Sequence, residues 1–143
     1  MTIPISDSES DPYRRLAVSN GNPAEQAMIR RWYFEELHSH GKLVWEYHIS
    51  GFYVDAVIFS DCIEREKEYS GSRVATAHPV TNRSIVICEA KRRLTPELIG
   101  QAVTYRCLLT SAGAHVKRTA LIVATTNGIL ATVARQFELD VVC

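Results

Sequence analysis

The segment SIVICEAKRR, residues 84–93, combines an apolar strand with charges that a buried strand should not carry. Ser84–Ala90 is rich in β-branched and apolar residues, which predicts a strand. Glu89 interrupts this run, and Lys91 shares its face because side chains alternate along a strand. An ionised acid removed from water is costly unless it is paired or binds a metal. The segment therefore indicates a polar site on a central strand.

A second misplaced acid lies upstream, in a predicted hairpin. Leu43–Ile49 and Phe52–Ser60 are strand-like and are separated by Ser50-Gly51, a short-loop signal. The second strand is apolar on both faces except at Asp55. If the two acid-bearing strands are neighbours, their carboxylates form a hard-oxygen site suited to Mg²⁺ or Mn²⁺. A lysine beside such an ion orients or deprotonates water and offsets developing negative charge.

The hairpin is flanked by a predicted helix and by an insertion. Asn22-Pro23-Ala24-Glu25 supplies an N-cap, a proline at the first helical position and an acid at the third, so we expect a helix from here to about His40-Gly41. Residues 61–83 are polar and mixed in charge, with Arg73–Ala77 as the only extended-looking piece. We interpret 61–83 as an insertion or a projecting hairpin, and a substrate-selecting arm and a dimer contact are equally open as its role.

Downstream of the lysine, Thr95-Pro96-Glu97 caps a predicted helix that runs to about Ala112. At 100° per residue an apolar face forms, and Gln101 falls inside its arc, four positions before Tyr105. The face consists of Leu98, Ala102, Tyr105, Leu109 and Ala112. Further on we expect a strand over Thr119–Ala124, a helix over Ile129–Phe137 and a short strand at Val141-Val142. This order of elements predicts an α/β fold with a mixed sheet and helices on its faces.

The composition is that of one soluble domain. The chain has 143 residues, 46% of them hydrophobic, with 16 basic and 16 acidic side chains. A chain of this length buries about 70% of its unfolded surface, so its core needs no metal or disulfide. We expect a disordered acidic tail over 1–20 and a single domain over 21–143. Four scattered cysteines and no membrane-length apolar run predict free thiols, no membrane partner and a cytoplasmic location.

The zero net charge argues against a broad basic surface, but the charges are unevenly placed. Residues 89–118 carry six basic and two acidic side chains, and this segment starts at the acid and lysine of the central strand. Phosphate contacts from such a segment are independent of sequence and sensitive to salt. The chain has no GxxxxGK, no GxGxxG and no legible Ser/His/Asp or Cys/His set, so the sequence gives no support to a nucleotide cofactor or a catalytic triad.

Taken together, these residues resemble the PD-(D/E)XK nuclease superfamily. Asp55 matches its first acid, Glu89-Ala90-Lys91 its E-x-K element, and Gln101 to Tyr105 the Q-x-x-x-Y element of its RecB-like branch. The stretch from Val86 to Gly128 is also similar to the N-terminal nuclease domain of type I restriction R subunits. The first motif reads Val54-Asp55 here instead of Pro-Asp. The resemblance implies a restriction-endonuclease-like core, namely a helix, a three-stranded meander, a helix and a strand.

The resemblance also implies a function, a Mg²⁺- or Mn²⁺-dependent deoxyribonuclease that hydrolyses phosphodiester bonds. In such enzymes the Asp and Glu hold the ion, the Lys assists the attacking water, and a Glu of the first helix often completes the shell. The metal set implied here is Asp55, Glu89, the Ala90 carbonyl and Glu25, with Glu35, Glu36 or Glu46 as substitutes for Glu25. The catalytic set is Asp55, Glu89, Lys91 and Gln101, and the expected nucleic-acid contacts are Arg92, Arg93, Tyr105 and Arg106.

Two other functions fit the same pattern. One is a nuclease-like fold that acts as a catalytically weak or inactive module for binding nucleic acid or protein, and the other is a nuclease directed at RNA. Endonuclease and exonuclease cleavage fit equally well. Because a domain of this size has little surface for target selection, we expect a homodimer or an accessory subunit beside the DNA partner.

Overall fold

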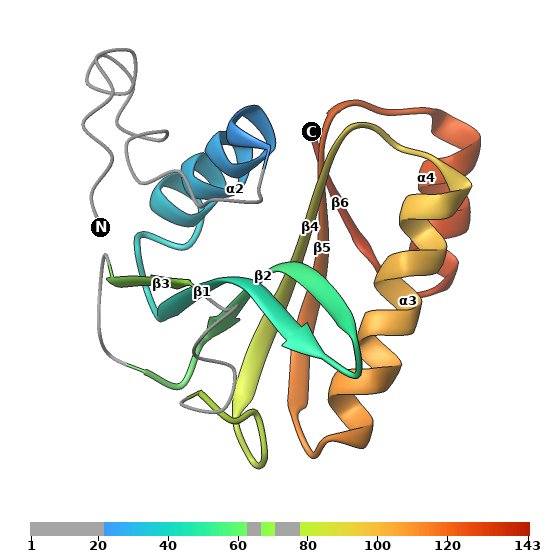
Figure 1. Ribbon diagram of the computed structural model, residues 1–143. Coiled ribbons are helices and arrows are strands. Elements are labelled where there is room, and N and C mark those ends of the chain that lie inside the picture. Colours follow the sequence, from blue (N-terminus) through green and yellow to red (C-terminus); the bar gives the residue numbers. More distant parts are fainter. Residues whose placement is uncertain (1–21, 63–66, 71–77) are drawn as a thin grey trace.

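The computed structural model describes residues 22–62, 67–70 and 78–143. The expected tail over 1–20 and the extended piece at Arg73–Ala77 lie outside these residues. The helices are α2 (Pro23–Glu35), α3 (Pro96–Ser111) and α4 (Gly128–Gln136). The strands are β1 (Lys42–Ile49), β2 (Phe52–Phe59), β3 (Lys67–Ser70), β4 (Ser84–Arg93), β5 (His115–Thr125) and β6 (Asp140–Val142). The chain thus has the mixed α/β fold that the sequence predicts (Figure 1).

The described strands form one sheet in the order β3-β1-β2-β4-β5-β6. β1, β2 and β4 pair antiparallel, whereas β5 pairs parallel with β4 and β6 parallel with β5. The β1–β2 turn is the one that the sequence indicates, since Ile49 pairs with Phe52 and both residues between them, Ser50 and Gly51, have positive φ. Such a two-residue turn matches the twist of the strands and sets their register. The acid-bearing strands β2 and β4 are therefore neighbours.

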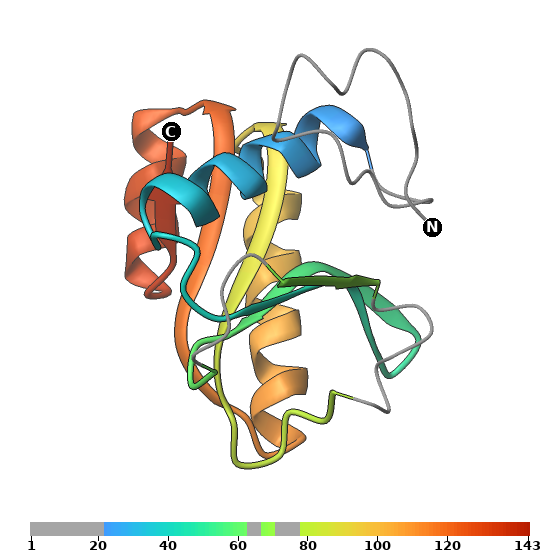
Figure 2. The ribbon, with the colours of Figure 1, turned by 90° about the vertical axis from the view of Figure 1, so that its left-hand side faces the viewer.

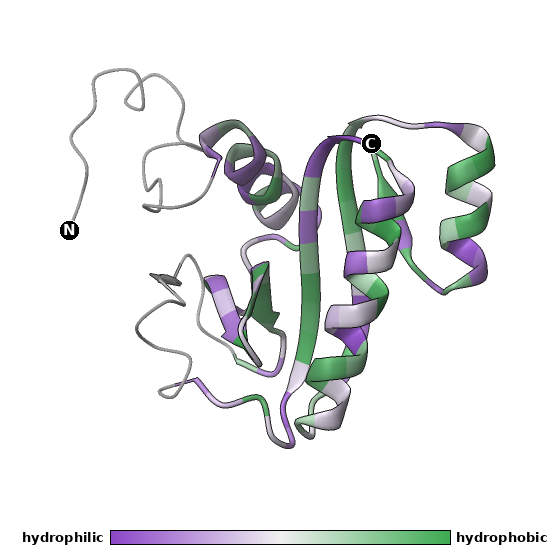
Figure 3. Cartoon of the chain, turned by 45° about the vertical axis from the view of Figure 1, so that its right-hand side comes forward, coloured by the Kyte–Doolittle hydropathy of each residue, from purple (hydrophilic) through white to green (hydrophobic). Residues whose placement is uncertain are grey.

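Helices cover both faces of the sheet. On one face α2 packs on the sheet, and Ile29, Trp32 and Tyr33 join a core with alternate residues of β1, β2, β4 and β5 (Figure 2). On the other face α3 and α4 cover further core residues of the same strands, and the alternation between the faces breaks at Glu46 in β1 and Asp55 in β2. The hydrophobic run of β4 changes to hydrophilic residues at its carboxyl end, next to the chain that leads into α3 (Figure 3). The polar end of β4 thus emerges from a core that is buried on both faces.

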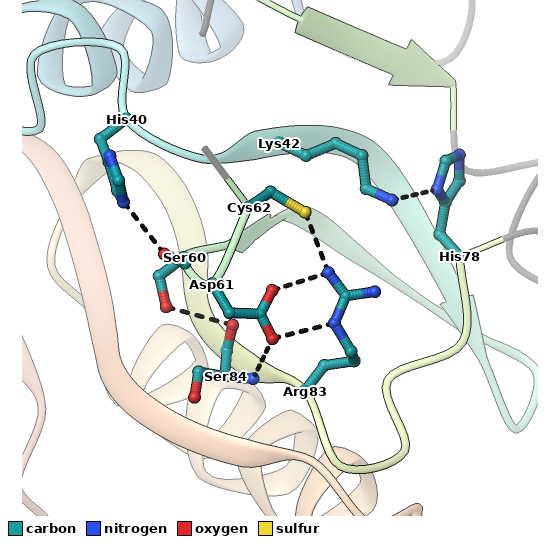
Figure 4. A network of polar contacts seen from close by, with 8 residues as sticks. All are labelled: His40, Lys42, Ser60, Asp61, Cys62, His78, Arg83 and Ser84. Carbon is teal, nitrogen blue, oxygen red and sulfur yellow. Dashed lines mark hydrogen bonds and ion pairs between the residues drawn. The ribbon is translucent and has the colours of Figure 1, made fainter. Parts of the chain in front are cut away.

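Polar contacts join the end of β2 to the start of β4 (Figure 4). The Arg83 guanidinium donates two hydrogen bonds to the Asp61 carboxylate, at 2.9 and 2.6 Å, and a third to Cys62 Sγ. Asp61 also accepts from the Ser84 backbone N–H. Arg83 holds the pKa of Asp61 at about 2, below its ordinary 3.8. This ion pair ties together the two ends of the 61–83 insertion.

Some expected elements differ in the structure. Helix α2 ends at Glu35, before the expected His40-Gly41, because His38 and Ser39 adopt left-handed φ values that no helix continues. The Tyr33 hydroxyl donates to the carbonyls of Ser39 and Gly41 and holds this turn. The insertion contributes strand β3, which the sequence did not predict. β3 pairs parallel with β1, and four residues are too few to show a periodic signal in the sequence.

Two predictions from composition can be compared with the described chain. All four cysteines, Cys62, Cys88, Cys107 and Cys143, are free thiols, as expected. No helix within the described ranges is both long and apolar enough to cross a membrane.

Candidate active site

Asp55 and Glu89 meet where β2 and β4 stop pairing. The backbone ladder between the strands runs from Phe59–Ile85 to Ala56–Cys88 and ends there. At the next position the Asp55 N–H donates to Glu89 Oε2 at 2.6 Å, and the Ala90 N–H donates to Asp55 Oδ2 at 2.9 Å. Each carboxylate thus accepts a hydrogen bond from a backbone N–H of the opposite strand. The tip of the β1–β2 hairpin lies away from β4 (Figure 2). We call this crossed pair the carboxylate fork.

Burial sets the charge state of the fork. Glu89 is 2% exposed, and burial, followed by repulsion from Asp55, raises its pKa well above the ordinary value. Burial also raises the pKa of Asp55 from 3.8 to about 6, and repulsion from Glu25 and Glu46 adds to this shift. The Ala90 N–H and the Lys91 ammonium act in the opposite direction. Because neither carboxylate is easily ionised alone, a cation at the fork would stabilise both.

A cleft of about 380 Å³ opens beside the fork. Its lining comes from the start of α2, from the hairpin and from β4, and consists of Asn22, Glu25, Gln26, Ile29, Glu46, Tyr53, Asp55 and Lys91. Lys91 is exposed, and its charge lowers the pKa values of Asp55 and Glu89. The structure therefore brings together the predicted acid, lysine and helix glutamate at one cleft.

Glu25 lies at this cleft because of how α2 begins. The Asn22 side chain accepts hydrogen bonds from the backbone N–H groups of Ala24 and Glu25, which caps the helix and points its first turn toward β2 and β4. The Glu25 carboxylate accepts no hydrogen bond from any residue that the structure describes. It is thus available to a ligand in the cleft. The N-terminus of a helix also favours acidic side chains, because it is the positive end of the helix dipole.

Glu46 is a second acid at the rim, which the sequence indicated only as a substitute for Glu25. It lies in β1 between Trp45, which pairs with Ala56, and Tyr47, which pairs with Val54, and is therefore level with Asp55. Its φ is +48°, a left-handed conformation that costs about 1 to 2 kcal/mol in a residue with a side chain. Strained backbone of this kind persists only where surrounding contacts impose it, and it concentrates at functional sites. The hairpin thus holds Glu46 at the cleft at an energetic cost.

Tyr105 belongs to the core between α3 and the sheet, near the fork. It is 8% exposed, its ring packs against Phe52 at 6.2 Å between centroids, and it belongs to the core under α3. Burial raises its pKa, and the charges of Glu89 and Asp55 add to the shift. The expectation that Tyr105 contacts nucleic acid does not suit a buried ring, which has no face free to stack on a base.

Gln101 was expected within the buried arc of α3, and this was wrong. The helix buries Leu98, Ala102, Tyr105 and Leu109 as predicted, but Gln101 is exposed and does not line the cleft. The reason is that α4 packs against α3, where Ile99 is also buried. This contact rotates the buried face toward α4 and leaves Gln101 on the solvent side.

The predicted arginines have three different surroundings. Arg92 and Arg93 are exposed at the end of β4, and Arg93 lines a separate cavity with the first residues of α3. Arg106 instead donates to the Phe137 carbonyl at 2.6 Å and to the Glu138 carbonyl at 3.5 Å. It closes the end of α4 and lies away from the fork, so only Arg92 and Arg93 fit the expected role near Lys91.

The donor set suits a small hard cation. Mg²⁺ commonly uses one or two carboxylates and keeps several waters. The fork supplies two carboxylates, each of which accepts a backbone N–H from the opposite strand. Within 22–62, 67–70 and 78–143, no cluster of three or more His, Cys, Asp or Glu side chains is close enough to hold a metal. Glu25 and Glu46 are thus candidates for contact through water. The Ala90 N–H is engaged by Asp55, and a role for its carbonyl stays a prediction.

Two residues of the cleft had no signal in the sequence. Gln26 is 4% exposed and Tyr53 is 50% exposed, and both join the cleft through long-range packing of α2 against the hairpin.

Comparisons with protein-family models, with curated proteins and with solved structures found no match to this chain.

Proposed function

We propose that this protein is a divalent-metal-dependent nuclease of the PD-(D/E)XK class that hydrolyses phosphodiester bonds in DNA. The single observation that carries the proposal is the carboxylate fork with Lys91 on the same cleft. The order of β1, β2, β4, α3 and β5 supports a restriction-endonuclease-like core. Two acids with raised pKa values beside one ammonium are typical of catalytic sites.

In this proposal each residue of the cleft has one task. Asp55 and Glu89 would hold the cation, which would supply Lewis-acid stabilisation to the phosphodiester oxygens. The Lys91 ammonium orients the attacking water and offsets negative charge as it builds on phosphorus. The exposed Arg92 and Arg93 hold the backbone of the strand, and the reaction takes place in the cytoplasm.

The direct test is a cleavage assay with linear, circular, branched and single-stranded DNA, and with RNA, in Mg²⁺ or Mn²⁺. We expect DNA cleavage by the wild type and a loss of about 100-fold or more in Lys91→Ala, because the charge that stabilises the transition state is removed. Glu97→Gln, an exposed acid of α3 outside the cleft, is the control and should cleave normally. Intact substrates under all conditions, or full activity in Lys91→Ala, would contradict the proposal.

Metal binding separates an enzyme from a binding module that only shares the fold. Calorimetric titration with Mn²⁺ should show binding that Asp55→Ala and Glu89→Gln abolish and that Glu97→Gln retains. Binding weakened by Glu25→Gln or by Glu46→Gln identifies which rim acid assists the fork. Cleavage of RNA in preference to DNA would reassign the substrate and leave the site unchanged.

A further inference from the structure

A second polar cleft, of about 480 Å³, lies on the other flank of α3 from the carboxylate fork. Consecutive residues of α3 divide the two regions, since Tyr105 packs against Phe52 and the core residues of β1, β2 and β4, and Arg106 lines the second cleft. The cleft is bounded by α3, by the first half of β5 and by the turn from α4 to β6. Four cationic side chains, Arg106, Lys117, Arg118 and Arg135, line it together with Glu138 and Asp140.

A buried hydroxyl in this cleft has no partner. Thr119 is 2% exposed, and its Oγ1 forms no hydrogen bond with the residues that the structure describes. A buried polar group without a hydrogen bond destabilises the fold, so such groups in native proteins call for an explanation. A ligand oxygen that accepts from Thr119 would provide one.

The cations of the cleft fall into two classes. Arg106 is held by the carbonyls of Phe137 and Glu138, and Arg118 forms an ion pair with Asp140 at 2.6 Å. Lys117 and Arg135 are exposed and form no ion pair or hydrogen bond with any described residue. Arg106 and Arg118 are thus held by contacts within the walls of the cleft. Lys117 and Arg135 are available to bind a ligand.

The edge of the sheet leaves room for this ligand. β6 pairs with β5 only from Ala120 to Ile122, whereas β4 pairs with β5 from His115 onward. The segment of β5 that contains Lys117 and Thr119 therefore has no second neighbouring strand in the described part of the chain. The cleft occupies the position that a longer β6 would cover.

We infer that this cleft binds a phosphate group. The planar guanidinium of Arg135 matches two phosphate oxygens, Lys117 adds a second positive charge, and the Thr119 hydroxyl donates to a third oxygen. A phosphate accepts several hydrogen bonds at once. It therefore suits three separate donors on one cleft better than a carboxylate, which has only two oxygens. The inference is independent of the proposed nuclease activity, because no residue of the fork takes part.

The test follows backbone amide signals by nuclear magnetic resonance during titration with sodium phosphate, with sodium chloride at equal ionic strength as the reference. We expect saturable shifts at Lys117, Thr119 and Arg135, at least about tenfold weaker binding in Arg135→Ala and severalfold weaker binding in Thr119→Val. Thr104→Val, which removes an exposed hydroxyl of α3, is the matched control and should bind normally. Shifts at these positions should also persist in Lys91→Ala.

A second titration with a short thymidine oligonucleotide distinguishes the source of the phosphate. Tighter binding of the oligonucleotide at the same residues supports a nucleic-acid backbone, and binding of inorganic phosphate alone supports a small phosphorylated compound. Thr119→Val keeps the shape of the side chain and should not lower the midpoint of thermal unfolding, so weaker binding in this variant reports on the hydroxyl. Shifts spread over all surface cations, or wild-type binding in both variants, would overturn the inference.

Discussion

At the scale of single residues, the fork consists of two acids held where ionisation is unfavourable. Asp55 and Glu89 each accept a backbone N–H at the point where β2 and β4 separate. These bonds stabilise the carboxylates, but burial outweighs them and the pKa values of both acids rise. A cation bound at the fork, as proposed, would therefore stabilise the folded protein, because it favours the ionised form of both acids.

This charge state predicts how stability depends on pH. The pKa of Asp55 is about 6 in the folded protein and 3.8 ordinarily. Between these values the folded chain retains a proton that the unfolded chain has lost, so the free energy of unfolding falls as pH rises through this window. At neutral pH without divalent ions, Asp55→Asn should be more stable than the wild type by on the order of 2 kcal/mol. At the acid end of the window the two proteins should be equally stable.

Urea unfolding in a chelator, at the two ends of this pH window, measures the effect. Glu97→Gln removes an exposed acid and should show no comparable change. Saturating Mn²⁺ should reverse the order at neutral pH, because the proposed metal site requires the Asp55 carboxylate, which Asp55→Asn lacks. A wild type that becomes more stable between pH 4 and 6 without metal would show that the fork is not penalised by burial.

At the scale of elements, the beginnings of helices are set locally, whereas their ends and buried faces are not. Asn22, Thr95 and Asn127 cap the three described helices through side-chain oxygens that accept backbone N–H groups. The caps at Asn22 and Thr95 were predicted, because a capping residue and the proline after it are adjacent in the sequence. The end of α2 and the buried side of α3 depend on contacts with distant residues.

The cap of α3 can be tested by substitution. The Thr95 Oγ1 accepts from the Leu98 N–H at 3.1 Å. We expect Thr95→Ala to lower the free energy of unfolding by about 1 kcal/mol, and Thr95→Ser to retain most of it. Thr104→Ala, in the same helix, removes a hydroxyl that bonds only to the Gly100 carbonyl and should change stability by less than about 0.5 kcal/mol. Equal losses at both positions in urea unfolding would argue against a capping role.

At the scale of the whole molecule, one ion pair reinforces the junction between the hairpin and the rest of the sheet. Asp61 follows β2 and Arg83 precedes β4, so their contact closes the insertion between the two acid-bearing strands (Figure 4). The carboxylate accepts two guanidinium bonds and one from the Ser84 N–H. Bidentate geometry makes this pair stronger than an ordinary surface pair.

Loss of this pair should weaken the global fold. Asp61→Asn should lower the free energy of unfolding by about 1 kcal/mol at neutral pH. The pKa of Asp61 lies at about 2, so its contribution is present above the ordinary value of 3.8 and is lost as pH falls through 2. The control is Asp140→Asn, whose partner Arg118 contacts it through one bond at a more exposed edge. A larger effect at Asp140 in thermal unfolding at neutral pH would contradict this role.

The sequence by itself determined most of the elements and the residues of the central motif. Local alternation and turn chemistry placed β1, β2 and β4 and put Glu89 and Lys91 on one strand, because these signals act between residues that are close along the chain. The pairing of β2 with β4, which brings Asp55 to Glu89, came only with the structure. It also placed Glu25 at the third position of a capped helix, and the structure brings that turn to the cleft.

Only the tertiary structure decided which side chains surround the fork and which do not. Packing of α4 turned Gln101 outward and engaged Arg106, and the hairpin forced Glu46 into a left-handed conformation opposite Asp55. The orphan hydroxyl of Thr119 likewise depends on how far β6 extends along β5. These features arise from contacts between distant parts of the chain, whose free energies have no counterpart in local sequence patterns.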